Sequence, residues 1–474
     1  MARDGRRSVL LTGASGNWGR ATLAELRGRD HLKVIALVLD TPKDRAVMEQ
    51  FADMDNLEII WGDLTDADVV AQCVRRVDVV LHIGAVVSPL ADAHPEMAWA
   101  VNPRAVSNIV KAVRALPDPS AVRVVGVGSV AETGNRAVPH HWGRIGDPVA
   151  VSWGDEYGQT KVIAERTMVE SGLPRWAWLR QTGIFHPGML EIRDPIMTHS
   201  PFADVMEWVS VEDAGRLAAN LAEDDVPEEF WGHVYNVGGG EQWRLTNWEL
   251  QEAIGGAMGV ADVRTWYRRD WFALKNFHGQ WYTDSDHLES LVHFREDPWQ
   301  GALERATEAQ PPIVRNAGKV PGWIVRELVM RRIAERPRGT LHALRTNNKE
   351  AIRAFFGSRE AWKEIGDWST FTPPAPSRTP SYLDHGFDES VPAERWDADI
   401  VRDAARFRGG ILVSDELSDD VPCRPLMWKC AEGHLFAASP KLILEAGHWC
   451  PVCVRDWSHY EDQAEANKFL AQVL

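Results

Sequence analysis

The chain has 474 residues, of which 45% are hydrophobic and 25% are charged, and its formal net charge is −16. This length exceeds what one hydrophobic core usually serves, so we expect two or more domains. The acidic balance argues against nucleic acid or an anionic membrane surface as the main partner. No apolar run is long enough for a bilayer-spanning helix or a signal-peptide core, and five cysteines do not make a disulfide framework. We therefore expect a cytoplasmic protein.

Residues 8–20, SVLLTGASGNWGR, predict a strand, a tight turn and a helix. A short apolar run precedes Gly13, Gly16 and Gly19, and apolar residues at helical spacing follow them. Glycine lets backbone approach a ligand closely, and the start of a helix leaves N–H groups that favour an anion. The pattern favours the pyrophosphate of a dinucleotide, although a glycine-rich turn without a ligand would have the same local sequence.

Further apolar runs alternate with helical patterns along the first half of the chain. The runs lie at residues 33–39, 57–61, 77–83 and 122–127, and the longest helical pattern is at 97–116. Strands that alternate with helices are typical of a parallel sheet covered on both faces. The predicted fold class is therefore α/β, with a doubly wound, Rossmann-like parallel sheet.

Asp40 follows the second of these strands and lies 21 residues beyond Gly19. At this point a dinucleotide fold places the acid that binds the adenosine ribose hydroxyls. Because a carboxylate repels a 2′-phosphate, Asp40 favours NAD over NADP. Arg20 and Lys43 could still serve a phosphate, and Asp40 could also be an ordinary residue of a turn at the end of a strand.

Tyr157 and Lys161 are four residues apart on a predicted helix, so their side chains share one face. A neighbouring ammonium favours the phenolate, and we expect Lys161 to lower the pKa of Tyr157 towards neutrality, as a general acid–base requires. Such a pair alone is more typical of a solvated helix surface. Its position after a fifth strand and the hydroxyl-bearing Ser129 favours the catalytic interpretation.

The first two-thirds of the chain resemble the extended short-chain dehydrogenase/reductase family, of the NAD-dependent epimerase/dehydratase type. The motifs that carry this resemblance occur in order along residues 12–240. They are TGASGNWG at 12–19, Asp40, GDL at 62–64, HIGA at 82–85, Asn102, Ser129, Tyr157–Lys161, LRQTGIFHPG at 179–188, VSVEDAG at 209–215 and VYNVGGG at 234–240.

The resemblance implies a role for several individual residues. Tyr157 would transfer a proton, Ser129 would hydrogen-bond the reacting oxygen, and Lys161 would hold the nicotinamide ribose and tune the tyrosine. Asp63 would contact the adenine, and Ala85 would line the nicotinamide side. The implied dinucleotide-binding residues are Gly13, Ser15, Gly16, Asn17, Trp18, Gly19, Asp40, Asp63, Leu64, Gly84, Ala85, Asn102, Tyr157 and Lys161. For Asn102, helix packing or capping is the alternative role.

The sequence also departs from the family pattern. Dehydratases of the family carry an Asp-Glu pair directly after the serine, and this chain has Val130 and Ala131, which disfavours sugar-nucleotide 4,6-dehydration. Arg180-Gln181 replaces a frequent Arg-Pro, and only 27 residues separate Arg180 from Trp208. This segment is short for a nucleotide-sugar site, so we expect a substrate other than a standard UDP- or dTDP-sugar.

The resemblance ends near residue 262, and residues 265–281 are rich in aromatic and basic side chains. Such a stretch could wall an apolar substrate pocket, but we interpret it as core packing between two lobes. His278 and Tyr282 are candidates for additional pocket groups, with a structural histidine as the more common case. Helical patterns then dominate residues 285–370.

The C-terminal segment carries two closely spaced pairs of potential metal ligands. Cys430 and His434 form the first pair, and Cys450 and Cys453 form the second. This spacing predicts a structural Zn²⁺ site of Cys₃His type, without an open position for catalysis. Cys423 or His448 could replace His434 as the fourth ligand. Residues 421–474 hold five Lys/Arg against six Asp/Glu, so the sequence does not favour nucleic-acid binding.

These patterns divide the chain into four parts. We expect a dinucleotide-binding core at residues 1–265, a mostly helical extension of the substrate lobe at 266–370, a linker and extended segment at 371–420, and a zinc-binding module at 421–474. Residues 371–381 contain four prolines and predict an extended linker. The sequence DHGFDE at 384–389 reads as a solvated turn without a ligand role.

The sequence thus predicts an NAD-dependent oxidoreductase that transfers hydride between nicotinamide and a secondary alcohol or ketone of a small-molecule substrate. One alternative is an epimerase or lyase that uses tightly bound NAD in an internal redox cycle. A second is a non-catalytic dinucleotide-sensing protein whose zinc module recruits a partner. A homodimer through the helices at 97–116 and 157–171 is expected from the resemblance alone.

Overall fold

The structure, a computed structural model, describes residues 5–191, 194–414 and 422–474. The predicted boundary between residues 420 and 421 lies outside these residues. Among the described residues, none of the helices is both apolar and long enough to traverse a membrane.

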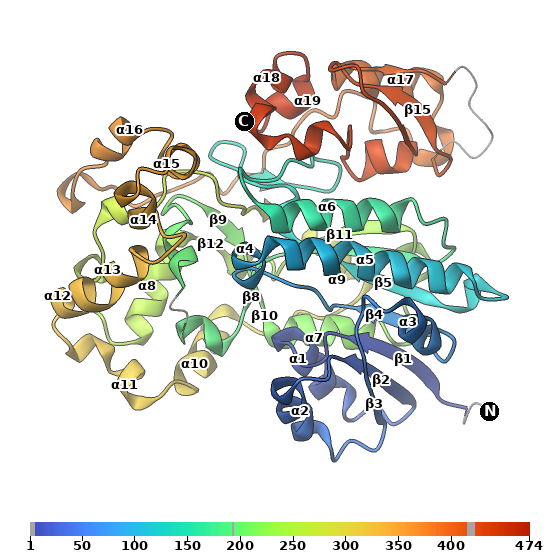
Figure 1. The fold of residues 1–474 in the computed structure, drawn as a ribbon, viewed down its shortest axis with the longest axis horizontal. Helices are drawn as coiled ribbons and strands as arrows, with labels where there is room; N and C mark the ends of the chain where they lie inside the picture. Colours follow the sequence, from blue (N-terminus) through green and yellow to red (C-terminus); the bar gives the residue numbers. More distant parts are fainter. Residues whose placement is uncertain (1–4, 192–193, 415–421) are drawn as a thin grey trace.

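A seven-stranded parallel sheet forms the centre of the molecule, in the order β11-β7-β5-β4-β1-β2-β3 (Figure 1). From β1 the chain adds β2 and β3 on one side, and it then continues with β4 on the other side of β1. Such a switch point, here between β1 and β4, opens a ligand crevice at the carboxyl ends of the strands. The predicted strands and the doubly wound fold are confirmed. The strands are β1 (Arg7–Thr12), β2 (Leu32–Val38), β3 (Leu57–Trp61), β4 (Val79–His82), β5 (Arg123–Val127), β7 (Trp176–Gln181) and β11 (His233–Val237).

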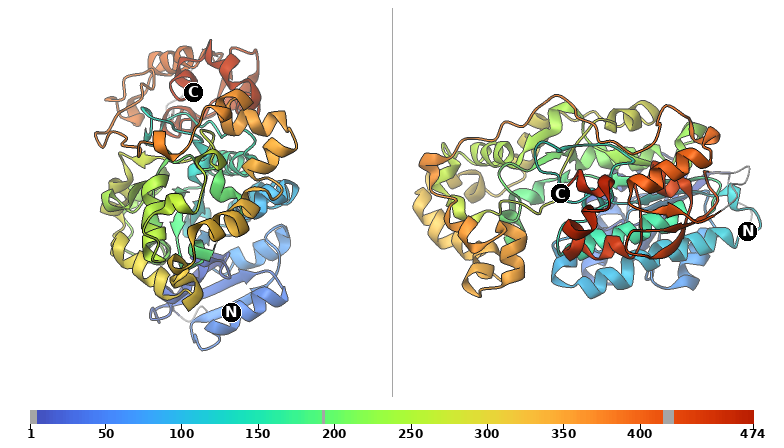
Figure 2. Two further views of the ribbon diagram at one scale, coloured as in Figure 1. Left: turned by 90° about the vertical axis from the view of Figure 1, so that its left-hand side faces the viewer. Right: turned by 90° about the horizontal axis from the view of Figure 1, so that it is seen from above.

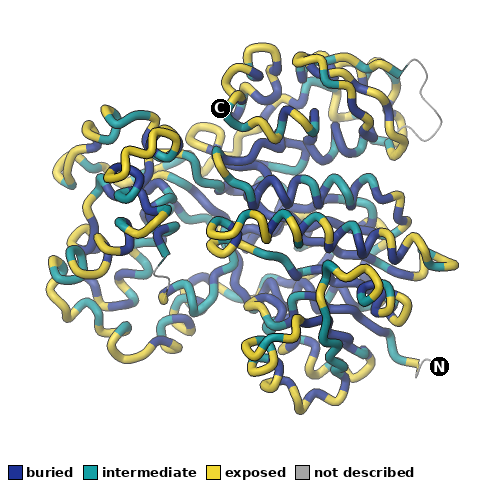
Figure 3. Tube along the Cα trace, in the orientation of Figure 1, coloured by how far each residue is buried: buried dark blue, intermediate teal, exposed yellow. Residues whose placement is uncertain are grey.

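Helices cover both faces of this sheet, so most of its strands are buried on both sides (Figure 3). Burial on both sides explains why the strands read as continuous apolar runs instead of alternating patterns. One face is covered by α1 (Asn17–Leu26), α2 (Pro42–Met48), α7 (Val211–Asn220) and α9 (Ser285–Leu291), and the other by α3 (Ala67–Val74), α5 (Pro95–Arg114) and α6 (Glu156–Val169).

A second lobe packs beside the carboxyl ends of the strands (Figure 1). It combines two-stranded pairings, which the sequence analysis did not predict, with helices, which it predicted for residues 285–370. Between residues 322 and 334 the helical chain contains a π-helical turn at Arg326–Met330. The pairings are β8 (Ile184–Phe185) with β10 (Val209–Ser210), β9 (Val205–Glu207) with β12 (Arg244–Thr246), and β6 (Trp142–Gly143) with β13 (Trp281–Tyr282). The helices are α8 (Asn247–Ala257), α10 (Trp299–Glu308), α11 (Pro312–Arg315), α12 (Gly322–Val325), α13 (Arg331–Ala334), α14 (Thr340–Arg345), α15 (Lys349–Phe356) and α16 (Arg359–Lys363).

The C-terminal module, residues 398–414 and 422–474, lies on α6 (Figures 1 and 2). Trp428 and Leu442 of this module share one hydrophobic core with Met168 on α6. Arg166 on α6 donates to the Ala437 carbonyl at 2.5 Å. The module contains α17 (Ala398–Phe407), a three-stranded antiparallel sheet of β14 (Ile411–Leu412), β15 (Leu426–Lys429) and β16 (Leu435–Ala438), and the helices α18 (Tyr460–Ala464) and α19 (Lys468–Ala471).

This arrangement bears on the expected homodimer. A partner that packed against α6 would have to displace the C-terminal module of the same chain. The homodimer stays a prediction.

Residues 371–381 contain no helix or strand, as the proline content predicts.

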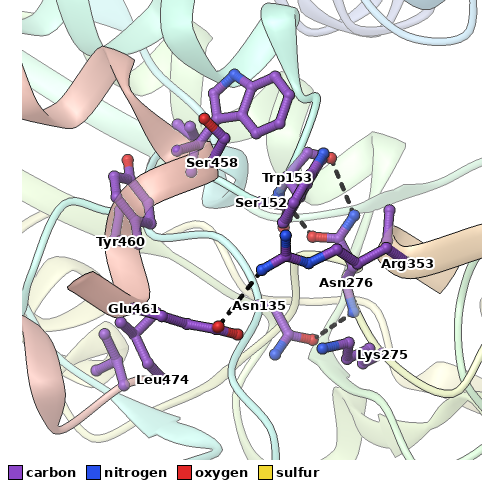
Figure 4. A pocket seen from close by; sticks show the side chains of 15 residues that line it. Asn135, Ser152, Trp153, Lys275, Asn276, Arg353, Ser458, Tyr460, Glu461 and Leu474 are labelled. Atoms are coloured by element: carbon purple, nitrogen blue, oxygen red, sulfur yellow. Dashed lines mark hydrogen bonds and ion pairs between the residues drawn. The ribbon is translucent and has the colours of Figure 1, made fainter. Parts of the chain in front are cut away.

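The second lobe also contacts the C-terminal module directly. A small cavity of about 130 Å³ lies between α15 and this module (Figure 4). There Arg353 lies 4.5 Å above the Trp153 ring and pairs with Glu461 at 3.4 Å. The cavity is below the range of about 300–1,000 Å³ that is usual for ligand pockets.

The prediction of a solvated turn at residues 384–389 is wrong for its histidine. His385 is 2% exposed, and its Nε2 lies 3.0 Å from the carboxylate of Asp147. Its Nδ1 lies 3.3 Å from Glu389, which also pairs with Arg144. Burial opposes protonation, but the bonds to Asp147 and Glu389 hold the pKa of His385 above its usual value.

Replacing His385 with glutamine is expected to lower the free energy of unfolding by about 2 kcal/mol at pH 6, since hydrogen bonds to charged groups are worth about 1.5–3 kcal/mol. A raised folded-state pKa contributes stability below the unfolded pKa, and this contribution is lost as pH rises through the folded pKa. The difference from wild type should therefore shrink at pH 9, as measured by urea unfolding. The matched change of the exposed His140 to glutamine should leave the free energy of unfolding unchanged; an equal loss at both pH values for His385 would contradict the charged pair.

Candidate active site and metal cluster

The glycines of the loop between β1 and α1 are required by backbone contacts. Gly13 has φ +72°, and a Cβ there would lie 2.7 Å from the Cα of Gly84, which follows β4. A Cβ at Gly19 would collide with the Gly13 carbonyl oxygen. Gly16 is the exposed N-cap residue of α1. The loop therefore holds the amino end of α1 at the switch point of the sheet, where its N–H groups suit an anion.

Thr12 and His82 lock this loop to the end of β4. Thr12 Oγ1 accepts from the Gly84 N–H at 3.0 Å and lies 2.9 Å from His82 Nδ1. Burial, followed by the nearby Lys161, lowers the pKa of His82 to about 3, so its imidazole is neutral. Both residues belong to motifs that carry the family resemblance, but neither was predicted to have this role.

Several predicted dinucleotide-binding side chains are engaged with the protein itself. Trp18 is buried and donates from Nε1 to the Ala214 carbonyl at 2.6 Å. Asn102 bonds both backbone groups of Val86, at 2.8 and 3.0 Å, and donates to Thr160 Oγ1 at 3.0 Å. These contacts support helix packing or capping, the alternative role that the sequence left open for Asn102.

The remaining predicted residues of this group lie at the loops that follow the strands. Asp63 is exposed and accepts from the Thr65 N–H at 2.7 Å, while Leu64 and Ala85 are half-buried. Ser15 is half-buried in the glycine loop. Asn17 is exposed, and its Nδ2 lies 3.2 Å from His186 Nε2, a residue that the sequence analysis did not single out.

Asp40 stands just beyond the carboxyl end of β2 but is not alone there. Arg45 donates to both of its carboxylate oxygens, at 2.5 and 2.9 Å, and this pairing lowers the pKa of Asp40. The Arg45 guanidinium also lies 4.4 Å above the Trp61 ring. Asp40 is thus an ionised carboxylate held by a cation, which the sequence analysis did not anticipate.

Ser129, Tyr157 and Lys161 come from β5 and α6. Lys161 Nζ donates to the Val127 carbonyl at 2.8 Å and lies 6.0 Å from the centre of the Tyr157 ring. Ser129 begins a helical turn, and its Oγ accepts from the Ala131 N–H at 3.2 Å. Asp155 caps α6 by accepting from the Gly158 N–H at 2.7 Å, and so fixes the turn that carries Tyr157.

The expected effect of Lys161 on Tyr157 is wrong. Burial raises the pKa of the Tyr157 phenol above its usual value, although a hydrogen bond with Ser129 opposes the rise. Burial also lowers the pKa of Lys161 to about 8. Because both side chains are nearly enclosed, loss of hydration is the largest influence on the pKa of each. Tyr157 is therefore a protonated phenol, which can donate a hydrogen bond or a proton.

A buried carboxyl group, Glu132, lies behind Ser129. Its Oε1 accepts from the Ser129 N–H at 2.7 Å, and its Oε2 is 3.9 Å from Arg180. Burial, together with the neighbouring Glu165, raises the pKa of Glu132 well above its usual range. Burial opposes ionisation of Glu165, but Arg180, which contacts it at 2.6 Å, and the hydrogen bonds of Glu132 and His448 together lower its pKa, so Glu165 is the ionised member of the pair. The sequence analysis missed Glu132.

Residues 9–172 match the family described as the NAD dependent epimerase/dehydratase family. Residues 9–172 form an NAD-dependent epimerase/dehydratase domain. A 3 beta-hydroxysteroid dehydrogenase/Delta 5-->4-isomerase of Mycobacterium tuberculosis is 27% identical over 239 residues, which are 48% of this chain and 59% of that relative. The chain therefore matches only part of that relative's length.

Solved structures share the fold of this domain and its lobe. A UDP-glucuronic acid 4-epimerase from Bacillus cereus, solved with UDP-glucuronic acid and NAD, aligns with a TM-score of 0.51 and 15% identity, over 66% of this chain and 99% of that one. The same enzyme in complex with NAD gives the same TM-score over 65% of this chain.

A polar cleft adjoins the epimerase/dehydratase domain beside Tyr157. This cleft, of about 490 Å³, is lined by Ser88 after β4, by residues 152–156 before Tyr157, and by His278 and Arg338 from the second lobe. His278 Nδ1 lies 3.6 Å from Asp155. His278 therefore lines a cleft next to the predicted site, whereas Tyr282 is buried away from solvent.

The C-terminal module brings together the four predicted metal ligands. The Nδ1 of His434 lies 3.3, 3.6 and 3.4 Å from the sulfurs of Cys430, Cys450 and Cys453, respectively. The sulfurs of Cys430 and Cys453 are 3.7 Å apart. A tetrahedron with Zn–S bonds of about 2.3 Å and a Zn–N bond of about 2.0 Å has edges of about 3.8 Å (S–S) and 3.5 Å (N–S). The cluster therefore could hold a metal ion.

His448, which the sequence left open as a ligand, has another partner. Its Nε2 lies 2.9 Å from Glu165 Oε1, and the neighbouring Ala446 carbonyl accepts from Arg180 at 2.7 Å. Residues beside the metal cluster thus reach the buried Glu165–Arg180 pair behind the predicted catalytic residues.

Proposed function

We propose that the protein is an NAD-dependent oxidoreductase that interconverts a secondary alcohol and a ketone of a small molecule. The observation that carries this proposal is the buried phenol of Tyr157 beside Lys161 and Ser129, at the carboxyl end of β5 in the same parallel sheet whose β1 ends in the glycine loop. A positioned phenol is a suitable proton donor for a carbonyl oxygen that becomes an alkoxide during reduction.

The loop between β1 and α1 fits a dinucleotide pyrophosphate. The close backbone contacts of Gly13 and Gly19 keep the amino end of α1 uncovered by side chains, and Gly16 adds none. Asp40, which Arg45 holds in place, would bind the adenosine ribose hydroxyls, and its carboxylate favours NAD over NADP. Asp63 and Ala85 would line the adenine and nicotinamide ends.

When bound, the nicotinamide would supply or accept the hydride. In the reducing direction, Tyr157 would donate its proton to the substrate oxygen, and Ser129 would orient that oxygen. Lys161 would hold the nicotinamide ribose, and Glu132 would fix the backbone of Ser129. Val130 and Ala131 provide no carboxylate next to Ser129, which argues against 4,6-dehydration.

We also propose that the cysteine–histidine cluster binds a structural Zn²⁺. Three sulfurs and one imidazole complete a tetrahedral shell, so no position would be left for substrate or an activated water. The ion would serve to hold β15 and β16 against the segment at 450–453, and no catalytic step would use it.

Incubation of the full chain with NADH or NADPH and a panel of ketones tests the oxidoreductase. A net loss of nicotinamide absorbance with alcohol formation, faster with NADH, is the expected result. Product formation without absorbance change would replace the proposal with the internal redox cycle of an epimerase or lyase. Dinucleotide binding without any product would replace it with a sensing role.

A further inference from the structure

An apolar cavity of about 480 Å³ lies in the second lobe, between α8 and the segment from α11 to α13. Its size is within the range of about 300–1,000 Å³ that is usual for pockets of drug-sized ligands. Trp266 and Tyr267, which we predicted to pack in the core, also line this cavity, together with methionines that include Met258 and Met330. The aromatic stretch therefore both packs and walls a pocket.

The charges around this cavity disfavour a nucleotide. Among the described residues that line it, none is lysine, arginine or histidine, and the acids are Glu191 and Asp204. A diphosphate here would therefore have no cation to pair with. Burial raises the pKa of Asp204 well above its usual range, and the same burial would penalise a charged ligand group beside it.

The polar side chains of the wall already satisfy one another. Ser200 donates to Asp204 at 3.2 Å, Gln251 donates to Asn247 at 3.2 Å, and Tyr267 donates to Gln251 at 3.1 Å. The rest of the wall is mostly aliphatic or aromatic. Such a surface gains free energy chiefly by burying apolar area of a ligand.

The cavity adjoins the polar cleft at one end and solvent at the other. Ile196 and Phe277 line both this cavity and the polar cleft, whose wall includes Glu156, the residue before Tyr157. Phe277 also packs against the cluster that contains Val130, the residue after Ser129. At the other end Ile313 and Val329 line the cavity and are 81% and 44% exposed, so the opening is itself apolar.

We propose that this cavity binds the body of a large, uncharged, apolar alcohol or ketone, whose reacting oxygen extends past Phe277 towards Tyr157. That this ligand is the substrate rests on the proposed function, whereas its chemical class rests on the cavity alone. A UDP- or dTDP-sugar is not accommodated by the same walls.

Titration of the full chain with Nile red, an uncharged apolar dye, tests this inference without turnover. We expect saturable binding with a blue-shifted emission. Ile254→Trp, which fills the cavity from α8, should weaken binding at least tenfold, and the exposed Glu252→Gln on the same helix should not change it. Should Ile254→Trp fail to fold, Val329→Arg at the exposed opening decides the question and should also weaken binding.

Competition distinguishes the ligand classes. 2-Dodecanone, a long-chain ketone, is expected to displace the dye, and UDP-glucose is not. Absent dye binding, equal binding by wild type and both cavity variants, or displacement by UDP-glucose would overturn the inference. Dye binding that responds to the variants in a protein that reduces no ketone would overturn the proposed function and leave an apolar ligand site.

Discussion

Replacing Tyr157 with phenylalanine is expected to lower kcat for ketone reduction by about 10³-fold, because a positioned general acid contributes about 10²–10⁴-fold to a rate. The ring itself packs against Ala91, Ala98 and Ala131, and phenylalanine keeps these contacts. The substitution therefore removes the proton donor without opening a cavity. KM should stay within about threefold, since the hydroxyl acts mainly in the transition state. Steady-state kinetics with NADH measures both values.

The control for this variant is another buried tyrosine. Tyr235 on β11 donates to the Phe230 carbonyl at 3.0 Å, on the far edge of the sheet from β3. Tyr235→Phe should cost stability of about 1 kcal/mol from the lost hydrogen bond and leave kcat unchanged. A Tyr157→Phe enzyme that retains wild-type kcat would show that another group donates the proton, with His278 of the polar cleft the next residue to test.

The features that were predictable from the sequence are those with a local signal. β1, β2, β4 and β5 are visible because a strand buried on both faces needs a continuous apolar run. The edge strand β3 is only half-buried, and its bounds, Leu57–Trp61, still match the predicted range. Gly13 and Gly19 are visible because no other residue fits between backbones that approach so closely. The pairs Cys430–His434 and Cys450–Cys453 are visible because the two members of each pair are only a few residues apart.

The features that were not predictable depend on contacts between distant segments. His448 and Glu165 are 283 residues apart, and neither one carries a local pattern that names the other as its partner. His385 pairs with Asp147 across 238 residues, which no periodicity indicates. The pKa of Tyr157 follows from its enclosure and not from the spacing to Lys161, so the helical register alone led to the wrong direction.

Contacts between distant segments also hold the buried guanidinium of Arg180. Arg180 is 1% exposed and held by Glu165 and the Ala446 carbonyl, so the C-terminal module supplies one of its partners. Burying a charge is tolerated only when it is paired and hydrogen-bonded. The module is thus part of what stabilises the core behind the site.

Removal of the proposed Zn²⁺ is expected to unfold the C-terminal module. Apparent binding free energies of structural Zn²⁺ in zinc-finger peptides are about 10–16 kcal/mol, which exceeds the stability of most small modules. Cys450→Ser, or a chelator, should therefore abolish amide exchange protection across β15 and β16 and expose the face of α6 that they cover. Metal analysis should find one zinc per chain before treatment, and hydrogen exchange measures the loss.

The specificity of this result is checked with Cys423, the exposed cysteine that the sequence left open as a ligand. Cys423→Ser should retain zinc and full protection, because Cys430, His434, Cys450 and Cys453 already complete the cluster.

Unfolding of the module should also reduce kcat for ketone reduction, since Glu165 would lose His448 while Lys161 lies one turn away on the same helix. A chain purified without zinc that keeps its exchange protection would contradict the structural role of the metal, because packing against α6 would then suffice to hold β15 and β16.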